Sequence, residues 1–370
     1  MIKKYINKTI RYSIILFLTF LTLYSVWKGI FWLVIPLIIC STLFFFMTSK
    51  TTKIRFLQIS YYLFIPPLLA LMMRVFIFEI CVVPSRSMED TIEVGDRLII
   101  NKLVYGPRMP RSIVEIPWIH GLFFYLVGSD AYFIKKEAAK LKPYRRLKGF
   151  GKVERNDIVI FDSPEGNGKL LVKRVVGVPG DTLELKNGQI IINGQVSKIP
   201  EHSKQIYSFS IKEEQLAKRQ LDSLKLIYYK CSESNNSNCW IAEIPFDKYL
   251  IVRKSEFIDS FKIFRSQKLP KETNWRLSDM WTFQNFGPIV VPHKGAKLNL
   301  QNEQNKDFFP TSFSEIQPSP HTGLVQIFVK DDYYFVMGDN RENSIDSRVF
   351  GLISARSIIG KGGQILRVGF

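Results

Sequence analysis

Three long stretches without a charged residue lie in the first 73 residues, and they constrain the fold more than any other feature of the sequence. They are Tyr12–Trp27, Gly29–Ser49 and Phe56–Met73. A helix needs about 20 predominantly apolar residues, with a range of roughly 17–25, to cross the hydrocarbon core of a bilayer. The second and third runs have this length, and Arg11 and Lys28 can extend the first by snorkelling. We therefore expect transmembrane helices at 12–27, 29–49 and 56–73, rather than buried helices of a soluble core or a cleaved signal peptide.

Basic residues flank these runs unevenly, which predicts their orientation. In short loops, Lys and Arg favour the cytoplasmic side. They cluster before the first run and between the second and third, at Lys3, Lys4, Lys8 and Arg11 and at Lys50, Lys53 and Arg55. Only Lys28 separates the first two runs. The residues after Met73 are therefore expected on the outer face of the membrane, whether or not the first run inserts.

The net charge of +18 raises the question of an anionic partner. Residues 1–80 carry nine Lys or Arg and one acidic residue, Glu79, so +8 of the +18 lies in the most apolar part of the chain. This distribution indicates a lipid bilayer as the partner, and no aromatic and basic motif of a nucleic-acid binder is present. The sequence has no CxxC, HExxH, GxxxxGK[ST] or GxGxxG motif, so we expect neither a metal nor a cofactor.

Short β-type runs separated by Gly, Pro and Asn follow Arg74 and predict a mainly β exported domain. The expected strands are 76–83, 97–104, 157–161, 170–178, 182–185, 189–192 and 333–337. We expect a membrane anchor at 1–73, a catalytic β domain built from 74–197 and 326–370, and an inserted, more polar cap domain at 198–325. A Pro-, aromatic- and Lys-rich insertion at 107–150 is expected to be a loop with some helix.

The four cysteines exclude a disulfide-dense scaffold. Cys231 and Cys239 flank a turn-forming Ser/Asn run and lie on the oxidising side of the membrane in the expected topology. Their spacing allows either a disulfide that closes a local hairpin or two free thiols. Cys40 and Cys81 are expected to be packing residues.

Three short segments stand out as candidates for chemistry. They are Pro84–Met88 followed by Glu93–Arg97, then Lys173–Asp181, and finally Gly338–Arg348. Each alone fits a turn or an edge-strand residue. Lys173, however, stands between the apolar runs 170–172 and 175–176, so burial is expected to lower its pKa. A neutral amine can take the proton of a Ser hydroxyl, which gives a nucleophile and base without histidine; the chain has only four histidines.

These segments resemble the conserved boxes of bacterial type I signal peptidases, which are membrane-bound Ser–Lys proteases. The resemblance covers roughly 74–106, 153–195 and 333–352. It implies that Ser87 is the nucleophile, that Lys173 is the general base and that Ser85, with the Ser87 backbone N–H, forms the oxyanion hole. It also implies that Ser344 orients the lysine, with Asp346 and Arg348 as a supporting ion pair. The positions matching the substrate groove are Val83, Met88, Ile92, Leu171 and Val172.

The function that the resemblance implies is cleavage of N-terminal signal peptides from exported preproteins at the outer, periplasmic face of the cytoplasmic membrane. Small side chains such as Ala are expected just before the cut. One alternative is a specialised processing protease with the same dyad and fewer substrates. Another is a non-catalytic envelope protein that binds extended peptides, although the presence of Ser87, Lys173 and Ser344 argues against it.

Two positions depart from the family's usual pattern. Family members usually have the sequence Met-x-Pro after the nucleophilic serine, whereas this chain has Met88-Glu89-Asp90, with Asp90 at the position of the proline. Asn156 replaces the Gly that commonly precedes Asp157. These changes concern the local backbone near the expected cleavage site rather than the Ser–Lys pair.

Overall fold

The computed structural model describes thirteen ranges of the chain, which are 8–27, 38, 40–42, 44, 65–112, 115–116, 143–164, 168–197, 203–231, 239–264, 281–299, 316–318 and 325–367. The chain divides into two compact units. The first unit comprises Met1–Ile77 and Pro110–Pro143, and the second comprises Phe78–Met109 and Tyr144–Phe370. Each unit is described by itself below.

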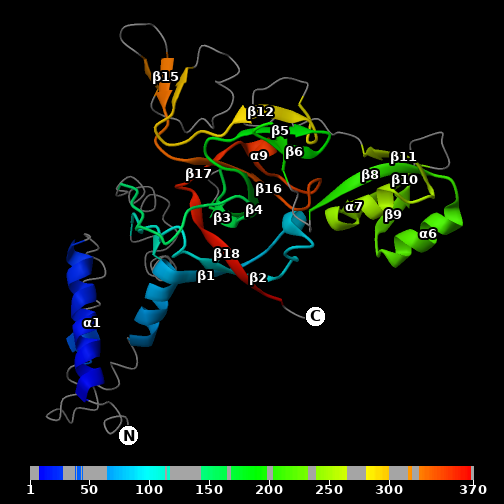
Figure 1. Ribbon diagram of the computed structural model, residues 1–370. Coiled ribbons are helices and arrows are strands. Elements are labelled where there is room, and N and C mark those ends of the chain that lie inside the picture. The colour runs from blue at the N-terminus through cyan, green and yellow to red at the C-terminus, as the bar shows by residue number, and fades with distance from the viewer. Residues whose placement is uncertain are drawn as a thin grey trace, which may run out of the picture. The chain divides into compact units, whose positions relative to one another are not determined.

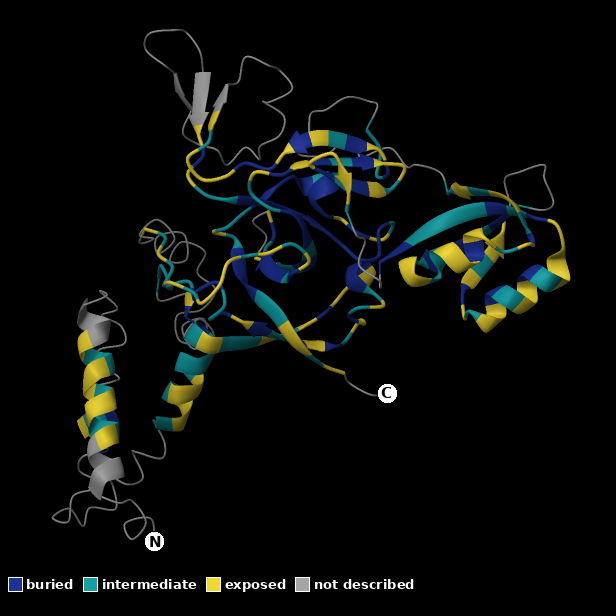
Figure 2. Cartoon of the chain, viewed as in Figure 1, coloured by how far each residue is buried: buried dark blue, intermediate teal, exposed yellow. Residues whose placement is uncertain are grey.

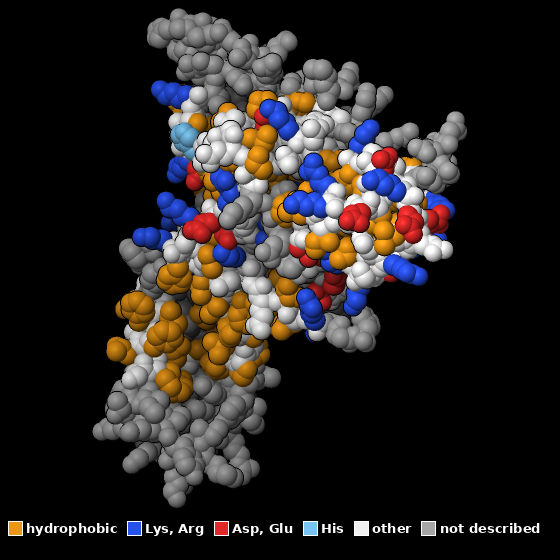
Figure 3. Space-filling model, turned by 45° about the vertical axis from the view of Figure 1, so that its right-hand side comes forward, with side chains coloured by type: hydrophobic (Ala, Val, Ile, Leu, Met, Phe, Trp, Pro, Cys, Tyr) orange, Lys and Arg blue, Asp and Glu red, His pale blue; other side chains and the backbone are white. Residues whose placement is uncertain are grey.

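The first unit contains helix α1 (Lys8–Trp27) and the π-helical turn η2 (Met73–Ile77). The expected span 12–27 lies within α1, and large apolar side chains are exposed in its middle part, at Leu16, Phe17, Phe20 and Leu23. Figure 2 colours much of this middle part as exposed, and Figure 3 shows hydrophobic side chains gathered on the described part of this unit. Most of the expected span 29–49 and the first half of 56–73 lie outside the described residues. Within the described ranges, no helix combines the length and the apolarity that crossing a membrane requires.

The second unit is built around a seven-stranded antiparallel sheet with the order β1-β2-β18-β3-β4-β16-β17 (Figure 1). Its strands are β1 (Phe78–Val82), β2 (Arg97–Asn101), β3 (Ile158–Asp162), β4 (Leu170–Gly177), β16 (Tyr333–Met337), β17 (Ile353–Ser354) and β18 (Ile358–Leu366). Alternating side chains enter the core, as in β2, where Leu98 and Ile100 are fully buried. The predicted mainly β character of this part of the chain is confirmed.

A second sheet packs beside the first and has the order β12-β5-β6-β7. It comprises β5 (Thr182–Lys186), β6 (Gln189–Ile192), β7 (Gln195–Val196) and β12 (Phe286–Val290). Asn187-Gly188 and Asn193-Gly194 join its first three strands, and all four residues have positive φ. Asn-Gly pairs favour the two-residue hairpin turn that needs this geometry. Buried residues of this sheet, such as Leu183 and Phe286, share one hydrophobic cluster with Val176 and Phe335 of the main sheet.

The segment 204–263 forms a third sheet with the order β11-β8-β10-β9 and two helices. Its elements are β8 (Lys204–Ile211), α6 (Glu214–Ser223), β9 (Ile227–Lys230), β10 (Cys239–Pro245), α7 (Phe246–Arg253) and β11 (Ile258–Ile263). It has a hydrophobic cluster of its own around Phe209, Trp240 and Phe257. We call this segment the cap segment. Cys231 and Cys239 are joined by a disulfide within it.

The expected inserted domain at 198–325 contains more than the cap segment. Its strand β12 pairs with β5 rather than with the cap sheet, because Phe286 and Ile289 bury their side chains against the main sheet. A small sheet with the order β13-β15-β14 also falls mainly in this range, with β13 (Lys297–Asn299), β14 (Ile316–Pro318) and β15 (Val325–Phe328). The second unit also contains two short helical turns, η3 (Arg86–Met88) and α9 (Ser347–Phe350).

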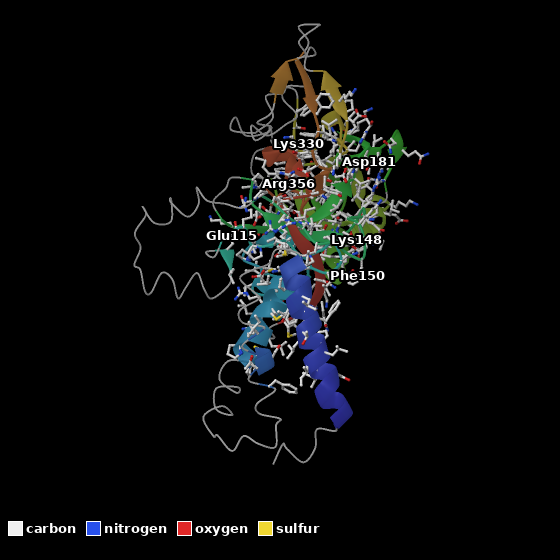
Figure 4. The ribbon with its side chains drawn as sticks, turned by 90° about the vertical axis from the view of Figure 1, so that its left-hand side faces the viewer. Glu115, Lys148, Phe150, Asp181, Lys330 and Arg356 are labelled. Atoms are coloured by element: carbon white, nitrogen blue, oxygen red, sulfur yellow. A yellow bond between two sulfur atoms is a disulfide. The ribbon has the colours of Figure 1, made fainter. Side chains whose placement is uncertain are left out.

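The C-terminal end of the predicted insertion at 107–150 is hydrogen-bonded to the segment that follows β2. Phe150 N–H donates to the Leu103 carbonyl, and Leu147 N–H donates to the Pro107 carbonyl. Gly149 packs so closely on Gly106 that a side chain at either position would overlap backbone atoms. Lys148 and Phe150 nevertheless project from this segment at the surface, and Phe150 is 90% exposed (Figure 4).

Candidate active site

The turn that carries Ser87 is fixed to the core on both sides. After β1, Val83 N–H donates to Asp96 O, and Gly95 N–H donates back to Val83 O, which closes the segment between them into a loop. Ser87 lies inside this loop on η3. The next residue, Met88, is fully buried, as is Ile92, whose N–H donates to Met88 O at 2.8 Å. The backbone around Ser87 is therefore anchored by packing and hydrogen bonds.

Lys173 reaches Ser87 from the centre of the main sheet. It lies in β4 opposite Val159 of β3 and is only 3% exposed. Its Nζ atom is 2.5 Å from Ser87 Oγ, although 86 residues separate the two in sequence. The structure thus brings together the two residues that the sequence analysis expects to act as nucleophile and base.

Burial changes the protonation of this lysine. Desolvation lowers the pKa of Lys173 from 10.5 to about 8, while the carboxylates of Asp346 and Asp339 act in the opposite direction. Burial is the larger effect because a charged ammonium loses its hydration inside the protein. Near neutral pH an appreciable fraction of the amine is therefore uncharged and able to accept a proton.

The other expected active-site serines occupy different surroundings. Ser85 Oγ lies 3.3 Å from Ser87 Oγ, next to the atom that would attack a substrate. Ser344 Oγ is buried and forms no hydrogen bond of standard geometry among the described residues, although its hydroxyl is close enough to Asp346 to help lower the pKa of that carboxyl. The expected contact in which Ser344 orients Lys173 is therefore not formed as a direct hydrogen bond. Ser344 instead lies against the backbone of Gly338, beside the carbonyl of Ser87.

Asp346 and Arg348 form a buried, bidentate ion pair. Arg348 Nε donates to Asp346 Oδ1 at 2.9 Å, and Nη2 donates to Oδ2 at 2.8 Å. Burial raises the pKa of Asp346, but the guanidinium of Arg348 outweighs it and holds that pKa below its usual value. Asp346 also accepts the N–H of Gly338, and Arg348 donates to the carbonyl of Arg341. The pair therefore ties the 338–348 loop together.

A second ion pair, which the sequence analysis did not single out, links β4 to the nucleophile loop. Arg174 follows Lys173 and donates twice to the fully buried Asp339, at 2.8 and 2.6 Å. The same carboxylate accepts the hydroxyl of Thr91 at 2.6 Å. Arg174 and Asp339 both lie in segments that the sequence indicates as candidates for chemistry. Their pairing, however, depends on strand register, which the sequence does not show.

The residues expected to line a substrate groove fall into two groups. Val83, Met88, Ile92 and Val172 belong to one buried hydrophobic cluster beneath the nucleophile turn. Leu171 packs against a different cluster, because neighbouring residues of a strand face opposite sides of the sheet. Met88 and Ile92 have no exposed surface, so in this structure they support the turn from below rather than present an open wall.

The polar groups around Ser87 are a buried amine, hydroxyls and two Arg–Asp pairs. In the described part of the chain, no group of three or more His, Cys, Asp or Glu residues is arranged to hold a metal ion. The amine and the hydroxyl are the groups that can supply a base and a nucleophile. This set suits nucleophilic attack by a serine.

Comparison with known proteins gives a consistent family assignment. The family model described as signal peptidase, peptidase S26, matches residues 56–260 and 284–366. Signal peptidase I of Buchnera aphidicola subsp. Baizongia pistaciae is 25% identical over 308 residues, which cover 80% of this chain and 71% of that protein. Signal peptidase I of Aquifex aeolicus is 23% identical over 303 residues, which cover 81% of this chain and 79% of that protein.

Two further proteins complete the comparison. Signal peptidase I of Helicobacter pylori strain 26695 is 22% identical over 297 residues, with 79% of this chain and 76% of that protein covered. A crystal structure of a signal peptidase I from Enterococcus faecalis has 21% identity and a TM-score of 0.22, and covers 57% of this chain. The family model spans most of the chain and includes Ser87, Lys173 and Ser344. The chain therefore belongs to the signal peptidase family, peptidase S26, and is a serine endopeptidase that removes signal peptides from preproteins.

Proposed function

We propose that Ser87 is the nucleophile of this peptidase and that Lys173 is its general base. The uncharged Lys173 amine takes the proton of Ser87 as Oγ attacks the scissile carbonyl, and it returns the proton to the leaving amine. The same amine then activates the water that hydrolyses the acyl-enzyme. The observation that carries this proposal is the 2.5 Å distance between Lys173 Nζ and Ser87 Oγ at a site where the lysine is almost completely buried.

The oxyanion of the tetrahedral intermediate needs donors beside the nucleophile. We assign this role to the Ser85 hydroxyl and the Ser87 backbone N–H, because Ser85 Oγ is only 3.3 Å from Ser87 Oγ. Removing one such donor typically lowers the rate by about 10²–10³. Ser85→Ala is accordingly expected to slow cleavage strongly without abolishing it.

The residues around Lys173 act through position rather than by contact with substrate. Asp346 and Arg348 hold the 338–348 loop, and this loop packs Gly338 and Ser344 against the Ser87 carbonyl. We propose that Ser344 fills the space beside the dyad and limits the movement of the lysine. The Ser344 hydroxyl also interacts with the Asp346 carboxylate, which places it between the ion pair and the nucleophile turn.

The site of action follows from the order of the chain. We propose that the three uncharged runs at 12–27, 29–49 and 56–73 anchor the enzyme as a multi-pass protein of the cytoplasmic membrane. The basic residues at the N-terminus and at 50–55 favour a catalytic domain on the outer, periplasmic face. Ser87 follows Met73 by only 14 residues (87 − 73). A membrane-inserted preprotein would therefore be cut close to the bilayer surface.

Specificity for small residues before the cut fits the apolar, tightly packed surroundings of the turn. Val83 and Val172 are almost fully buried in the apolar cluster that also contains Met88, the residue after Ser87. A small pocket excludes large side chains sterically. We propose that signal peptides with Ala at the residues just before the cleavage site are preferred.

The test uses the full-length protein in detergent with a preprotein that carries an Ala-x-Ala site. Sequencing of the new N-terminus is expected to place the cut directly after the second Ala. A matched preprotein in which this Ala is replaced by Phe is expected to remain uncut. Cleavage at unrelated positions, or equal cleavage of both preproteins, would contradict the proposed function.

A further inference from the structure

A buried lysine from the cap segment lies among three carboxylates next to the nucleophile turn. Lys204 is the first residue of β8 and is 7% exposed. Its Nζ atom is 2.9 Å from Glu89 Oε2, 3.4 Å from Glu243 Oε1 and 3.5 Å from Asp90 Oδ2. Glu89 and Asp90 belong to the turn that follows Ser87, whereas Glu243 belongs to β10 of the cap. One ammonium group therefore joins the cap to the turn.

The backbone of Lys204 is joined to the same region. Its N–H donates to Asp339 O at 3.0 Å, and its carbonyl accepts the N–H of Arg341 at 3.1 Å. Between these residues, Asn340 donates its backbone N–H to Ser87 O at 3.1 Å and its side-chain amide to Glu89 Oε2 at 3.1 Å. Lys204 and Asn340 thus contact one carboxylate together, and Asn340 holds the carbonyl of the nucleophile itself.

The charges around Lys204 indicate the role of its ammonium group. Without Lys204, three carboxylates would converge in a partly buried space, and their described partners would be the Asn340 amide and the exposed Arg86, whose Nε is 4.0 Å from Glu89 Oε1. Like charges in such surroundings repel each other strongly. Asp90 also has a φ of 72°, a left-handed conformation that costs energy for a residue other than Gly. The turn keeps this conformation only while its surroundings hold it.

We propose that Lys204 is a positioning residue for catalysis, which sets the nucleophile turn through Glu89. The inference rests on Ser87 being the nucleophile. The cap segment then completes the active site from outside the main sheet, rather than being an independent appendage. Because a displacement of about 1 Å in a reacting group can lower a rate on the order of 10²-fold, loss of this contact should reduce cleavage without touching the dyad.

The first experiment measures kcat and KM for an Ala-x-Ala preprotein in detergent, with thermal unfolding recorded for every variant. Lys204→Met is expected to lower kcat by about 10- to 100-fold with KM unchanged. Lys218→Met is the matched control, because Lys218 forms a 2.9 Å pair with Glu214 in the same cap but on its exposed surface. The control is expected to keep the kcat of the unmodified enzyme.

A double-mutant cycle separates positioning from a general loss of stability. Glu89→Ala removes the acceptor shared by Lys204 and Asn340 and leaves Lys204 paired with Asp90 and Glu243. It should lower kcat by a similar factor, and the double variant Lys204→Met with Glu89→Ala should be no slower than the slower single variant. The midpoint of the pH profile, which reports Lys173, should not move.

The kinetic results for these variants decide whether Lys204 positions the nucleophile turn. Normal kcat in a folded Lys204→Met or Glu89→Ala variant overturns the inference, as does a double variant whose losses multiply. If Lys204→Met does not fold, Glu89→Ala decides alone. Cleavage by Ser87→Ala would defeat the proposed function as a whole, whereas an inactive Ser87→Ala beside fully active Lys204→Met and Glu89→Ala variants defeats this inference only.

Discussion

Gly338 lies so close to Ser344 that a Cβ atom at position 338 would come within 2.3 Å of Ser344 Oγ. The same atom would lie 2.5 Å from the carbonyl oxygen of Ser87. Both distances are far below van der Waals contact, so only a hydrogen fits there. The absence of a side chain at one residue thus sets how closely the 338–348 loop approaches the nucleophile.

Replacing this glycine tests whether that approach matters. Gly338→Ala must displace the Ser87 carbonyl or the Ser344 side chain, and overpacking of this kind costs about 1–3 kcal/mol of unfolding free energy. We expect cleavage to fall at least about tenfold. Gly151→Ala is the control, since a Cβ there would meet Val104 at an ordinary 3.5 Å. Unchanged cleavage by Gly338→Ala would show that the loop has room to adjust.

The pH dependence of cleavage follows from the lowered pKa of the base. Lys173 must be uncharged to act, and its pKa is lowered by burial to about 8. Below pH 8 the amine is increasingly protonated, so kcat/KM should fall about tenfold per pH unit, and it should level off above pH 8. The measurement is kcat/KM between pH 6 and 10. A midpoint near the ordinary lysine value of 10.5 would mean that the amine is not buried as described.

Burial of this lysine should also cost stability. A pKa lowered from 10.5 to about 8 corresponds to about 3 kcal/mol of unfavourable free energy at pH 7, at about 1.4 kcal/mol per unit. This cost is present below pH 8 and disappears above pH 10.5, because the unfolded chain then also loses the proton. Lys173→Met is therefore expected to unfold at a higher temperature than the unmodified protein at pH 7, with a smaller difference at pH 10. A lower melting temperature at pH 7 would argue that the amine is stabilised in place.

The two departures from the family pattern have different structural consequences. Asp90 has φ 72°, which proline cannot adopt because its ring fixes φ near −65°. Asp90→Pro is expected to lower the free energy of unfolding by about 1–3 kcal/mol and to impair cleavage. Asn156 has φ 70°, which Gly adopts without strain, so Asn156→Gly should change stability by less than about 1 kcal/mol. Urea denaturation of both variants checks this contrast, and equal stability would refute it.

The strands that the sequence predicts are those with clear local signals. Asn-Gly turns and alternating apolar residues mark β5 and β6, and both form at the expected residues. Strand β18 was not predicted, because it contains Gly360, Gly362 and Gly363, and glycine disfavours strands. The structure gives the reason for one of them: a Cβ at Gly360 would lie 2.6 Å from Asn101 O of the neighbouring strand. The close approach of the two backbones requires glycine at this position, although glycine has a low strand propensity. No local sequence pattern reveals this approach.

The active-site residues also differ in whether a local sequence signal identifies them. Ser87 and Lys173 were identified because the hydroxyl and the buried amine have a recognisable chemistry in recognisable segments. Lys204 was not, because one lysine at the start of a polar stretch has no such signal. Its role depends on β8 beginning beside Asn340, a pairing between segments more than 130 residues apart. Tertiary pairing, rather than composition, places it beside the nucleophile turn.

The most direct test of the Ser–Lys mechanism is the initial rate of preprotein cleavage by Ser87→Ala and Lys173→Met, measured in detergent beside the unmodified enzyme and with folding verified by thermal unfolding. Both variants should remain folded, and both should lose cleavage by at least about 10³-fold. A folded variant of either kind that still cuts the preprotein at the same bond and at a comparable rate would contradict the account.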